Sequence, residues 1–355
     1  MKPYRLRLRL EGSLGTPLSA DTLFGHLCWG IVYHEGTAAL EAFLAAMRST
    51  DPPLVLGDPM PAGFLPVPVL SPRDLAEADR MEAVAADEVA RKAKAQGHAA
   101  LSSGDRLKRT HALRKQAGKA AWLPADALAA RLDDLSAASV FDLALDGAPP
   151  PALCRATVVH NTINRLSQHT AEEGGLYALP EDFPPPGPDD SRPGMDFDVY
   201  LRSTLPSARI RALFEQGLKG GYGRDAGTGK GKVAVGDLDD HPWPAAREPN
   251  AVLALGVFAP AADDPAQGWW RATVRLGKLG GPWAFDDAGR HPPFKYPLVL
   301  LLAGALLGPW KGRPFVGRLV EGVHPTRPEV VTYAIAPVLP VRCPALATAG
   351  AEVVP

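Results

Sequence analysis

The stretch GGYGRDAGTGKGKV, residues 220–233, decides how the rest of this sequence is interpreted. Four glycines follow the pattern G-x-G-x5-G-x-G: Gly221, Gly223, Gly229 and Gly231. Glycine adopts positive φ without strain and lets a phosphate come close to backbone N–H groups. Three cations lie in the same stretch: Arg224, Lys230 and Lys232. The stretch therefore predicts a flexible, cation-bearing loop, which we call the glycine loop.

The elements beside the glycine loop set its place in a fold. An apolar stripe predicts a helix over 205–218 before it, and short strands are predicted at 197–202 and 233–235. The helix-to-strand order excludes a P-loop and a dinucleotide fingerprint, because both run from strand to helix. A connection without a ligand is the alternative interpretation. Five cations against Glu215 and Asp225 favour a polyanion instead: Arg211, Lys219, Arg224, Lys230 and Lys232.

Farther out, residues 3–10 alternate between apolar and basic side chains, which predicts a half-buried strand with a basic outer face. That face suits either plain solvation or RNA contact. A helix follows, which Ser19 or Asp21 can cap. Together with the elements around the glycine loop, the order is strand, helix, two strands, helix, strand. This is the βαββαβ order of a ferredoxin-like unit.

The sequence predicts an α+β protein with two ferredoxin-like domains. The first spans 1–240, with a helical insertion at about 73–135, and the second spans 245–355. In the second, strands are predicted at 252–258, 269–276, 316–320 and 330–335, with a helix at about 296–307. Residues 153–160 (LCRATVVH) and 175–179 (GLYAL) read as strands joined by a polar stretch, which predicts a β-hairpin finger.

Charge is segregated along the chain, although the formal net charge is only −1. Residues 91–119 hold nine Lys or Arg and one acid, Asp105, a net charge of +8. A basic stripe attracts phosphates whatever a distant face carries. A solvated helix face and an arm ordered only by RNA or a partner are the alternatives, and we expect this segment to pack poorly in the free chain.

Composition favours a cytoplasmic globular protein. The N-terminus lacks an apolar signal-peptide core, and the apolar run 298–307 is too short to cross a bilayer. The three cysteines, Cys28, Cys154 and Cys343, have no metal-type spacing. We therefore expect no metal site, no cofactor and no membrane contact.

Several segments in order along the chain resemble one known family. The glycine loop is similar to the signature of the RAMP superfamily, whose members have RRM-like, ferredoxin-like domains and build CRISPR complexes. Other segments are similar to the subunit of type III-A (Csm) complexes that binds the 5′ handle of the guide RNA: TPLSADTLFGHLCWGI (16–31), FLPVPVL (64–70), VVHNTINRLSQHTAEEGGLYAL (158–179), GKLGGPWA (277–284), LLAGALL (301–307), GRLVEGVHP (317–325) and VTYAIAPVLPV (331–341). The resemblance runs to about residue 341. The sequence departs from it where LLAGALL has alanine in place of an expected serine and where His26 replaces a smaller residue.

The resemblance implies a non-catalytic subunit for antiviral defence. Such a subunit binds the repeat-derived 5′ handle of crRNA, lies near the target RNA, and caps the effector complex beside the large Cas-ten-type subunit and the backbone RAMP subunits. On this basis the RNA-binding residues are those of the glycine loop, with Tyr222 as a candidate stacking platform, together with His160, Asn161 and Arg165 of the HNTINR motif. A buried anchor is the alternative for Tyr222, and a turn with local hydrogen bonds is the alternative for HNTINR.

Two other functions stay open. Some RAMP proteins cut precursor guide RNA with a histidine near the first helix, where His26 and His34 lie, so metal-independent RNA processing is the first alternative. His26 lies in an apolar stretch, which favours a structural role. A scaffold subunit without direct RNA contact is the second alternative.

Overall fold

The computed structural model describes the whole chain except residues 73, 96–100, 171–174, 188–191, 285–290 and 348–355. Its main sheet joins segments far apart in sequence, in the order β2-β8-β1-β9, and β3 also pairs with β8. The strands are β1 (Lys2–Leu10), β2 (Leu54–Leu56), β3 (Met60–Pro61), β8 (Met195–Ser203) and β9 (Val233–Asp240). All pairings are antiparallel. With a helix after β1 and another between β8 and β9, the first unit has the predicted βαββαβ element order.

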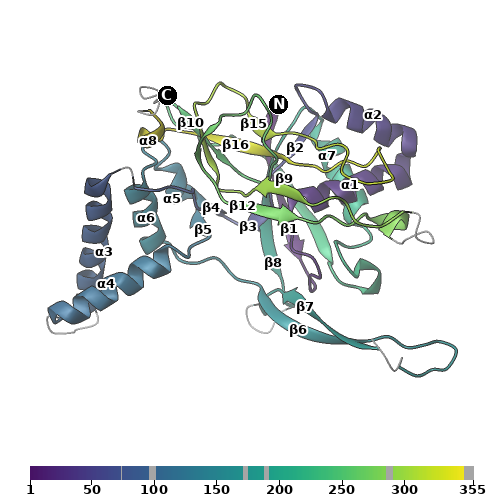
Figure 1. Ribbon diagram of the computed structural model, residues 1–355, viewed down its shortest axis with the longest axis horizontal. Coiled ribbons are helices and arrows are strands. Elements are labelled where there is room, and N and C mark those ends of the chain that lie inside the picture. The colour runs from purple at the N-terminus through teal and green to yellow at the C-terminus, as the bar shows by residue number, and fades with distance from the viewer. Residues whose placement is uncertain (73, 96–100, 171–174, 188–191, 285–290, 348–355) are drawn as a thin grey trace.

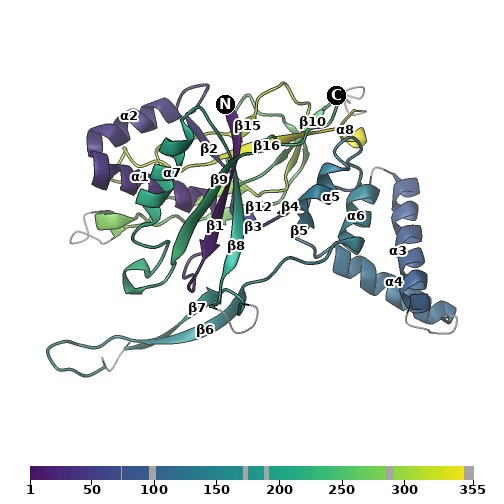
Figure 2. The ribbon, with the colours of Figure 1, turned by 180° about the vertical axis from the view of Figure 1, so that it is seen from behind.

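Two helices cover one face of this sheet, α1 (Ala20–Glu35) and α7 (Ser207–Leu218), and α2 (Thr37–Met47) follows α1 (Figures 1 and 2). The apolar half of β1 faces them, since Leu6, Leu8 and Leu10 are fully buried. The two helices approach closely at Gly30, where a Cβ would lie 2.8 Å from the Gly217 nitrogen. This packing fixes the end of α7, and hence the start of the glycine loop, against α1.

The basic outer face of β1 is neutralised within the sheet. Arg7 donates to Asp198 at 2.7 Å, and Arg9 donates to Asp196 at 3.0 Å. Both pairs face each other directly across the β1–β8 register. Arg5 forms an ion pair with Asp239, which lies directly opposite it on β9, and Lys2 forms one with Asp240. Neither solvation nor RNA contact was expected to involve these ion pairs, which hold the cations of β1 against carboxylates of the same sheet.

A second antiparallel sheet is formed by the C-terminal part, in the order β11-β14-β10-β16-β15. Its strands are β10 (Ala251–Ala254), β11 (Gln267–Trp269), β14 (Leu306–Gly308), β15 (Phe315–Gly317) and β16 (Ile335–Val341). Beside it lie a ribbon of β12 (Ala272–Arg275) and β13 (Leu298–Leu301), the 3-10 turn η3 (Gly281–Ala284) and the short helix α8 (Pro344–Ala347).

The prediction of a helix at about 296–307 is wrong. This apolar run instead forms β13 and β14, separated by Gly304 at φ +91. A Cβ at Gly304 would lie 2.5 Å from the Val67 carbonyl oxygen, so the chain reverses where only glycine fits. A short, continuous apolar run does not distinguish a buried strand from a buried helix, which explains the error.

The predicted insertion is a helical arm at one end of the long axis (Figure 1). It contains α3 (Leu75–Ala95), α4 (Ser103–Ala117), α5 (Ala125–Ala129) and α6 (Ala137–Asp146). A ribbon of β4 (Phe64–Pro66) and β5 (Trp122–Pro124) joins it to the body. Helices α3, α4 and α6 pack around a small core of Ala85, Ala117 and Phe141. The arm is therefore a compact helical unit with a thin core.

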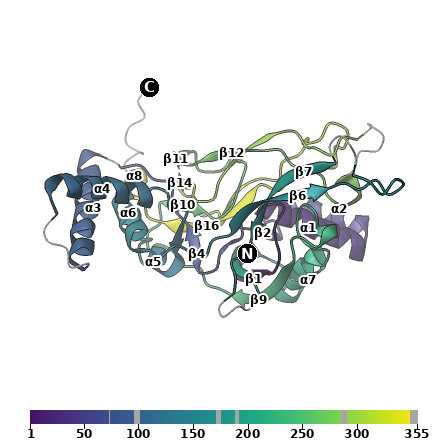
Figure 3. The same cartoon turned by 90° about the horizontal axis from the view of Figure 1, so that it is seen from below.

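The predicted hairpin finger is formed by β6 (Cys154–Asn161) and β7 (Leu176–Phe183), paired from Cys154↔Phe183 to Asn161↔Leu176. It projects from the body on the side opposite the arm (Figure 3). None of the helices in the described ranges is long and apolar enough to cross a membrane.

Candidate nucleic-acid interface

The glycine loop has the backbone geometry that its sequence predicts. Gly221, Gly223, Gly229 and Gly231 have φ of +88, +74, +94 and +63. A Cβ at Gly223 would lie 2.8 Å from Thr16 Cβ, and one at Gly231 would clash with the Tyr222 backbone. The loop also contains the 3-10 turn η2 (Ala226–Thr228). All four glycines are thus required by backbone conformation, whatever the loop binds.

The amides of the four glycines and of Arg224 already donate hydrogen bonds within the chain. The Gly223 N–H donates to His26 Nε2 at 2.9 Å, and the Arg224 N–H donates to Thr16 Oγ1 at 3.0 Å. The amides of Gly221, Gly229 and Gly231 donate to backbone carbonyls. The four glycines therefore shape the loop, and contact with an anion falls to its side chains.

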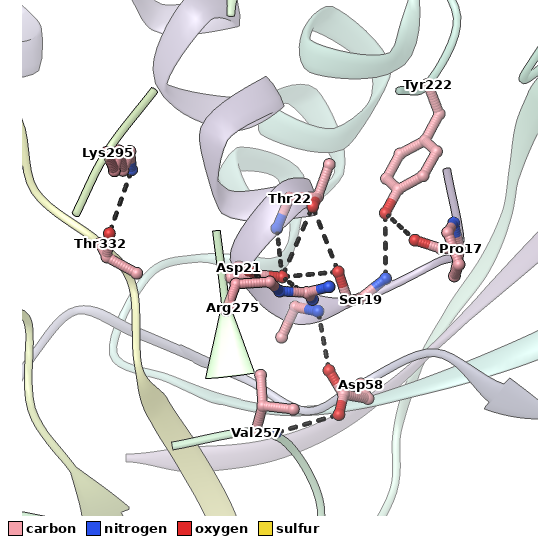
Figure 4. Close-up of polar contacts among 11 residues, drawn as sticks. Pro17, Ser19, Asp21, Thr22, Asp58, Tyr222, Val257, Arg275, Lys295 and Thr332 are labelled. Carbon is pink, nitrogen blue, oxygen red and sulfur yellow. Dashed lines mark hydrogen bonds and ion pairs between the residues drawn. The ribbon is translucent and has the colours of Figure 1, made fainter. Parts of the chain in front are cut away.

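Tyr222 is a buried anchor, so the prediction that it stacks on a base is wrong. Its side chain is 0% exposed. Its hydroxyl accepts from the Ser19 N–H at 3.0 Å and donates to the Pro17 carbonyl at 2.8 Å (Figure 4). Burial raises the pKa of Tyr222 to about 12, so the hydroxyl stays protonated at neutral pH. The residue ties the glycine loop to the segment that precedes α1.

Lys230 joins the glycine loop to the base of the hairpin. Its ammonium donates to Glu181 of β7 at 2.5 Å and lies 3.3 Å from Asp225. His160 of β6 contacts the same Glu181 oxygen at 3.0 Å and stacks on Tyr177. Desolvation acts to raise the pKa of Glu181, but the hydrogen bonds from Lys230, Ser13 and His160 and the charge of Lys230 together outweigh it, so this pKa lies below its ordinary value. Two segments that the sequence analysis treated separately therefore meet at one buried carboxylate.

A groove of about 450 Å³ runs between the end of α7, the glycine loop and β9. Three lysines line it, Lys219, Lys230 and Lys232, with Glu215 as the one acid among its lining residues. Lys219 is exposed. Lys232 reaches Glu11 at 2.9 Å, yet its side chain is 67% exposed. We call this feature the lysine groove.

Of the remaining predicted site residues, Arg224 lies in the glycine loop, and Asn161 and Arg165 lie on the hairpin. Arg224 donates to the Pro180 carbonyl at 3.0 Å, which adds a second link between the loop and the hairpin. Asn161 is exposed at the outer end of β6, and Arg165 is exposed in the turn beyond it. That turn is held by the Asn164 side chain, which accepts from Leu166 N at 2.9 Å. The structure thus brings His160 and Lys230 together and leaves Asn161 and Arg165 on the projecting finger.

The two histidines considered for catalysis differ in setting. His26 Nε2 accepts the Gly223 amide, and the ring stacks on Tyr222 with centroids 5.2 Å apart. Desolvation lowers the pKa of His26, which favours the neutral ring that this acceptor role requires. His34 is exposed near the end of α1. His26 is thereby assigned a structural role in holding the loop.

A second polar cluster, around the start of α1, was not foreseen from the sequence (Figure 4). Asp58, which follows β2, accepts from the Ala20 N–H at 2.8 Å and from the Val257 N–H at 3.0 Å. Asp21 forms a bidentate pair with Arg275 at 2.8 and 2.9 Å. The predicted capping of α1 by Ser19 or Asp21 differs from the structure. Ser19 occupies the N-cap position, but its side chain forms no capping hydrogen bond, and Asp58 accepts the Ala20 N–H at the start of the helix instead. The cluster fastens the N-terminal unit to the C-terminal part.

The residues missed by sequence reasoning are mainly the acids Glu181, Asp58 and Glu11. Each lies far along the chain from the cation or helix end that it contacts, so the spacing of residues in the sequence does not indicate the contact. Asp58 is also a single acid in a proline-rich stretch. Within the described ranges, no three His, Cys, Asp or Glu side chains come together as metal ligands.

Comparison with known proteins identifies the fold. No family model matches the sequence, and no curated protein matches it. Three crystal structures of the Csm1-Csm4 cassette, in complex with AMPPNP, pppApA and cA4, contain a chain of the same fold at 15% identity each. The TM-scores are 0.51, 0.50 and 0.52, over 97%, 97% and 96% of this chain and 99% of each matched chain. The matched subunit is Csm4, so the resemblance stated from the sequence is confirmed at the level of fold.

Proposed function

We propose that this chain is the non-catalytic subunit of a type III CRISPR interference complex that binds the repeat-derived 5′ handle of crRNA. It caps the cytoplasmic complex beside the large Cas-ten-type subunit. The observation that carries the proposal is the meeting of the glycine loop and the hairpin finger at Glu181, beside an exposed groove lined by lysines. Nearly full-length agreement with the Csm4 fold supports it.

In this function, handle RNA is held through side chains. Lys219 and Lys232 of the lysine groove supply cations for the phosphates, since both are exposed. Asn161 and Arg165 on the finger contact the handle or the target RNA near it. Single-stranded RNA is commonly bound by such a combination of backbone contacts and polar contacts to splayed bases.

We also propose that the chain consists of two ferredoxin-like domains, 1–240 and 245–355. The sheet order β2-β8-β1-β9 with α1 and α7 on one face supports the first. The antiparallel sheet built on β10 and β16 supports a related second unit. The cluster of Asp58, Asp21 and Arg275 joins them.

Exposed apolar side chains support a role in an assembly. On the β12–β13 ribbon, Val274 and Val299 lie directly opposite each other and are 67% and 64% exposed. Leu276 and Tyr296 extend the same region at 60% and 50%. Contiguous apolar surface of this kind marks interaction sites. The solved relatives were crystallised as a Csm1-Csm4 cassette, so we propose docking on a Cas-ten-type subunit as well as on backbone RAMP subunits.

Purification of the tagged chain from its native host, followed by sequencing of bound RNA, tests the proposal. We expect guide RNAs with a uniform repeat-derived 5′ end and co-purifying type III subunits. Recovery of the subunits without any RNA contact to this chain, measured by crosslinking, would favour the scaffold. Cleavage of labelled repeat RNA by the purified chain without metal, lost in His26→Ala, would favour the processing nuclease and contradict the proposal.

A further inference from the structure

Helix α4 of the arm presents an exposed basic face to solvent. Its outward cations are Arg106, Lys108, Arg109 and Lys115, and Lys119 follows just beyond the helix end. The one acid of the helix, Asp105, accepts from the Ser102 hydroxyl at 2.7 Å. The helix thus carries a strong local charge that the nearly neutral chain as a whole does not show.

Neighbouring cations of the arm are paired, which makes this face distinct. Arg91 reaches Glu88 at 2.5 Å and Asp146 at 2.8 Å, and Lys92 reaches Glu88 at 3.3 Å. Arg114, on the side of α4 toward α3, pairs with Glu82 at 3.3 Å. By contrast, no ion pair in the described part of the chain involves the five outward cations. A solvated helix is commonly laced with pairs, so a helix whose exposed cations Lys108 and Lys115 share one stripe, with Arg109 beside them, calls for an anionic partner.

The helix positions these cations for a phosphate chain. Thr110 and Ala117 are buried on the inner side, while Lys108 and Lys115 share the outer stripe. Seven residues separate the two lysines, which is about 10 Å along a helix. Phosphates follow one another about 3.4 Å apart along the axis of a stacked strand, so the stripe spans roughly three of them. Exposed His111 lies beside these lysines, and the cations themselves are suited to phosphates, which carry no sequence information.

The arm lies away from the finger that carries the other proposed RNA contacts. The arm and the finger project from opposite ends of the molecule in two perpendicular views (Figures 1 and 3). The ligand of α4 is therefore a separate stretch of polyanion.

We infer that α4 is a second RNA-binding surface, which holds the sugar–phosphate backbone of single-stranded RNA without reading its sequence. The inference rests on the proposed function only for the presence of RNA in the assembly. The flank of the target RNA and a distant part of the guide share this chemistry. An acidic protein surface is the competing partner, and the test below separates it.

The test compares the full-length chain with Lys108→Gln/Arg109→Gln/Lys115→Gln, using a fluorescent oligouridylate that is long enough to reach α4. Glutamine keeps helix propensity, so far-ultraviolet circular dichroism should be unchanged. Because single-stranded binding loses about 0.7 in the slope of log K against log salt per phosphate contact, the triple variant should lose about 2. The control Arg80→Gln/Lys94→Gln/Lys311→Gln removes three exposed cations outside α4 and should leave the slope unchanged.

The outcomes separate this inference from the handle site. Lysine-groove variants should weaken a short handle oligonucleotide, and the α4 variant should not. Crosslinking in the purified complex, with photoreactive groups in either the guide or the target, identifies which RNA reaches α4. An unchanged salt slope in the α4 variant overturns the inference, as does loss of a protein subunit from the complex without loss of RNA, or binding of duplex DNA alone.

Discussion

The Lys230 ammonium on the glycine loop donates to the Glu181 carboxylate on the hairpin at 2.5 Å, and both side chains are largely shielded from solvent. This pair joins segments 49 residues apart in sequence. Since Lys230 is engaged inside the protein, we propose that it organises the glycine loop and that the exposed Lys219 and Lys232 contact the RNA. The distinction between organising and contacting residues gives the following predictions.

Glu181→Gln should loosen the base of the hairpin. The change leaves the Lys230 ammonium without its main counter-charge in a desolvated position, which is unfavourable. Desolvation acts to lower the pKa of Lys230. Its hydrogen bonds to Glu181 and Asp225 nevertheless bring this pKa above its ordinary value, so the lysine stays charged. Amide hydrogen exchange across 154–160 and 176–183 should become faster. The control Glu215→Gln, an exposed acid of the lysine groove, should leave this exchange unchanged.

Gly223→Val should destabilise the protein by about 2 kcal/mol or more, because a β-branched residue is strained at positive φ. The backbone there has φ +74, and a Cβ would lie 2.8 Å from Thr16 Cβ. Thermal unfolding measures the effect. Gly227→Ala is the matched control, since a Cβ there meets nothing within 4 Å. Equal melting temperatures for the wild type and Gly223→Val would show that the loop does not hold this conformation.

Tyr222→Phe should lower the free energy of unfolding by about 1–3 kcal/mol, because it leaves the Ser19 N–H and the Pro17 carbonyl without their hydrogen-bond partner. RNA binding should fall only as far as the loop loosens, since the ring is inaccessible to a base. Tyr177→Phe on the exposed hairpin is the control and should leave stability unchanged. If Tyr222→Phe abolished RNA binding at unchanged stability, the anchoring role would be wrong.

Asp58 should make stability depend on pH in the acid range. Burial raises the pKa of Asp58 to about 6, above the model-peptide value of 3.8. The folded state therefore binds a proton at Asp58 more tightly than the unfolded state. This tighter binding adds to the free energy of unfolding below a pH of about 4, and the added stability is lost as pH rises toward 6. Asp58→Asn removes the contribution.

The destabilisation caused by Asp58→Asn should accordingly be larger at pH 4.5 than at pH 7, as measured by thermal unfolding of both proteins. Asp87→Asn, which changes an exposed carboxylate of α3, is the control and should give the same small difference at both pH values. A larger effect at pH 7 than at pH 4.5 would contradict the burial argument.

Elements with a strong local pattern could be predicted from the sequence. The alternation of residues 3–10 and the apolar stripe of 205–218 gave β1 and α7 within two residues, and the hairpin followed from two strand-like runs around a polar turn. The prediction for 296–307 failed because a uniformly apolar stretch has no periodicity that distinguishes a strand from a helix. Positive φ at the four loop glycines was foreseen, whereas the use of their amides was not, because His26 and Thr16 approach the loop only through tertiary packing.

Binding of the handle RNA to Lys219→Gln/Lys232→Gln, measured as a function of salt, tests the central claim most directly. We predict that the slope of log K against log salt falls by about 1.4, from two lost contacts at about 0.7 each. The control Lys94→Gln/Lys311→Gln should bind with the slope of the wild type. An unchanged slope in the groove variant would show that the lysine groove does not hold the phosphates of the handle.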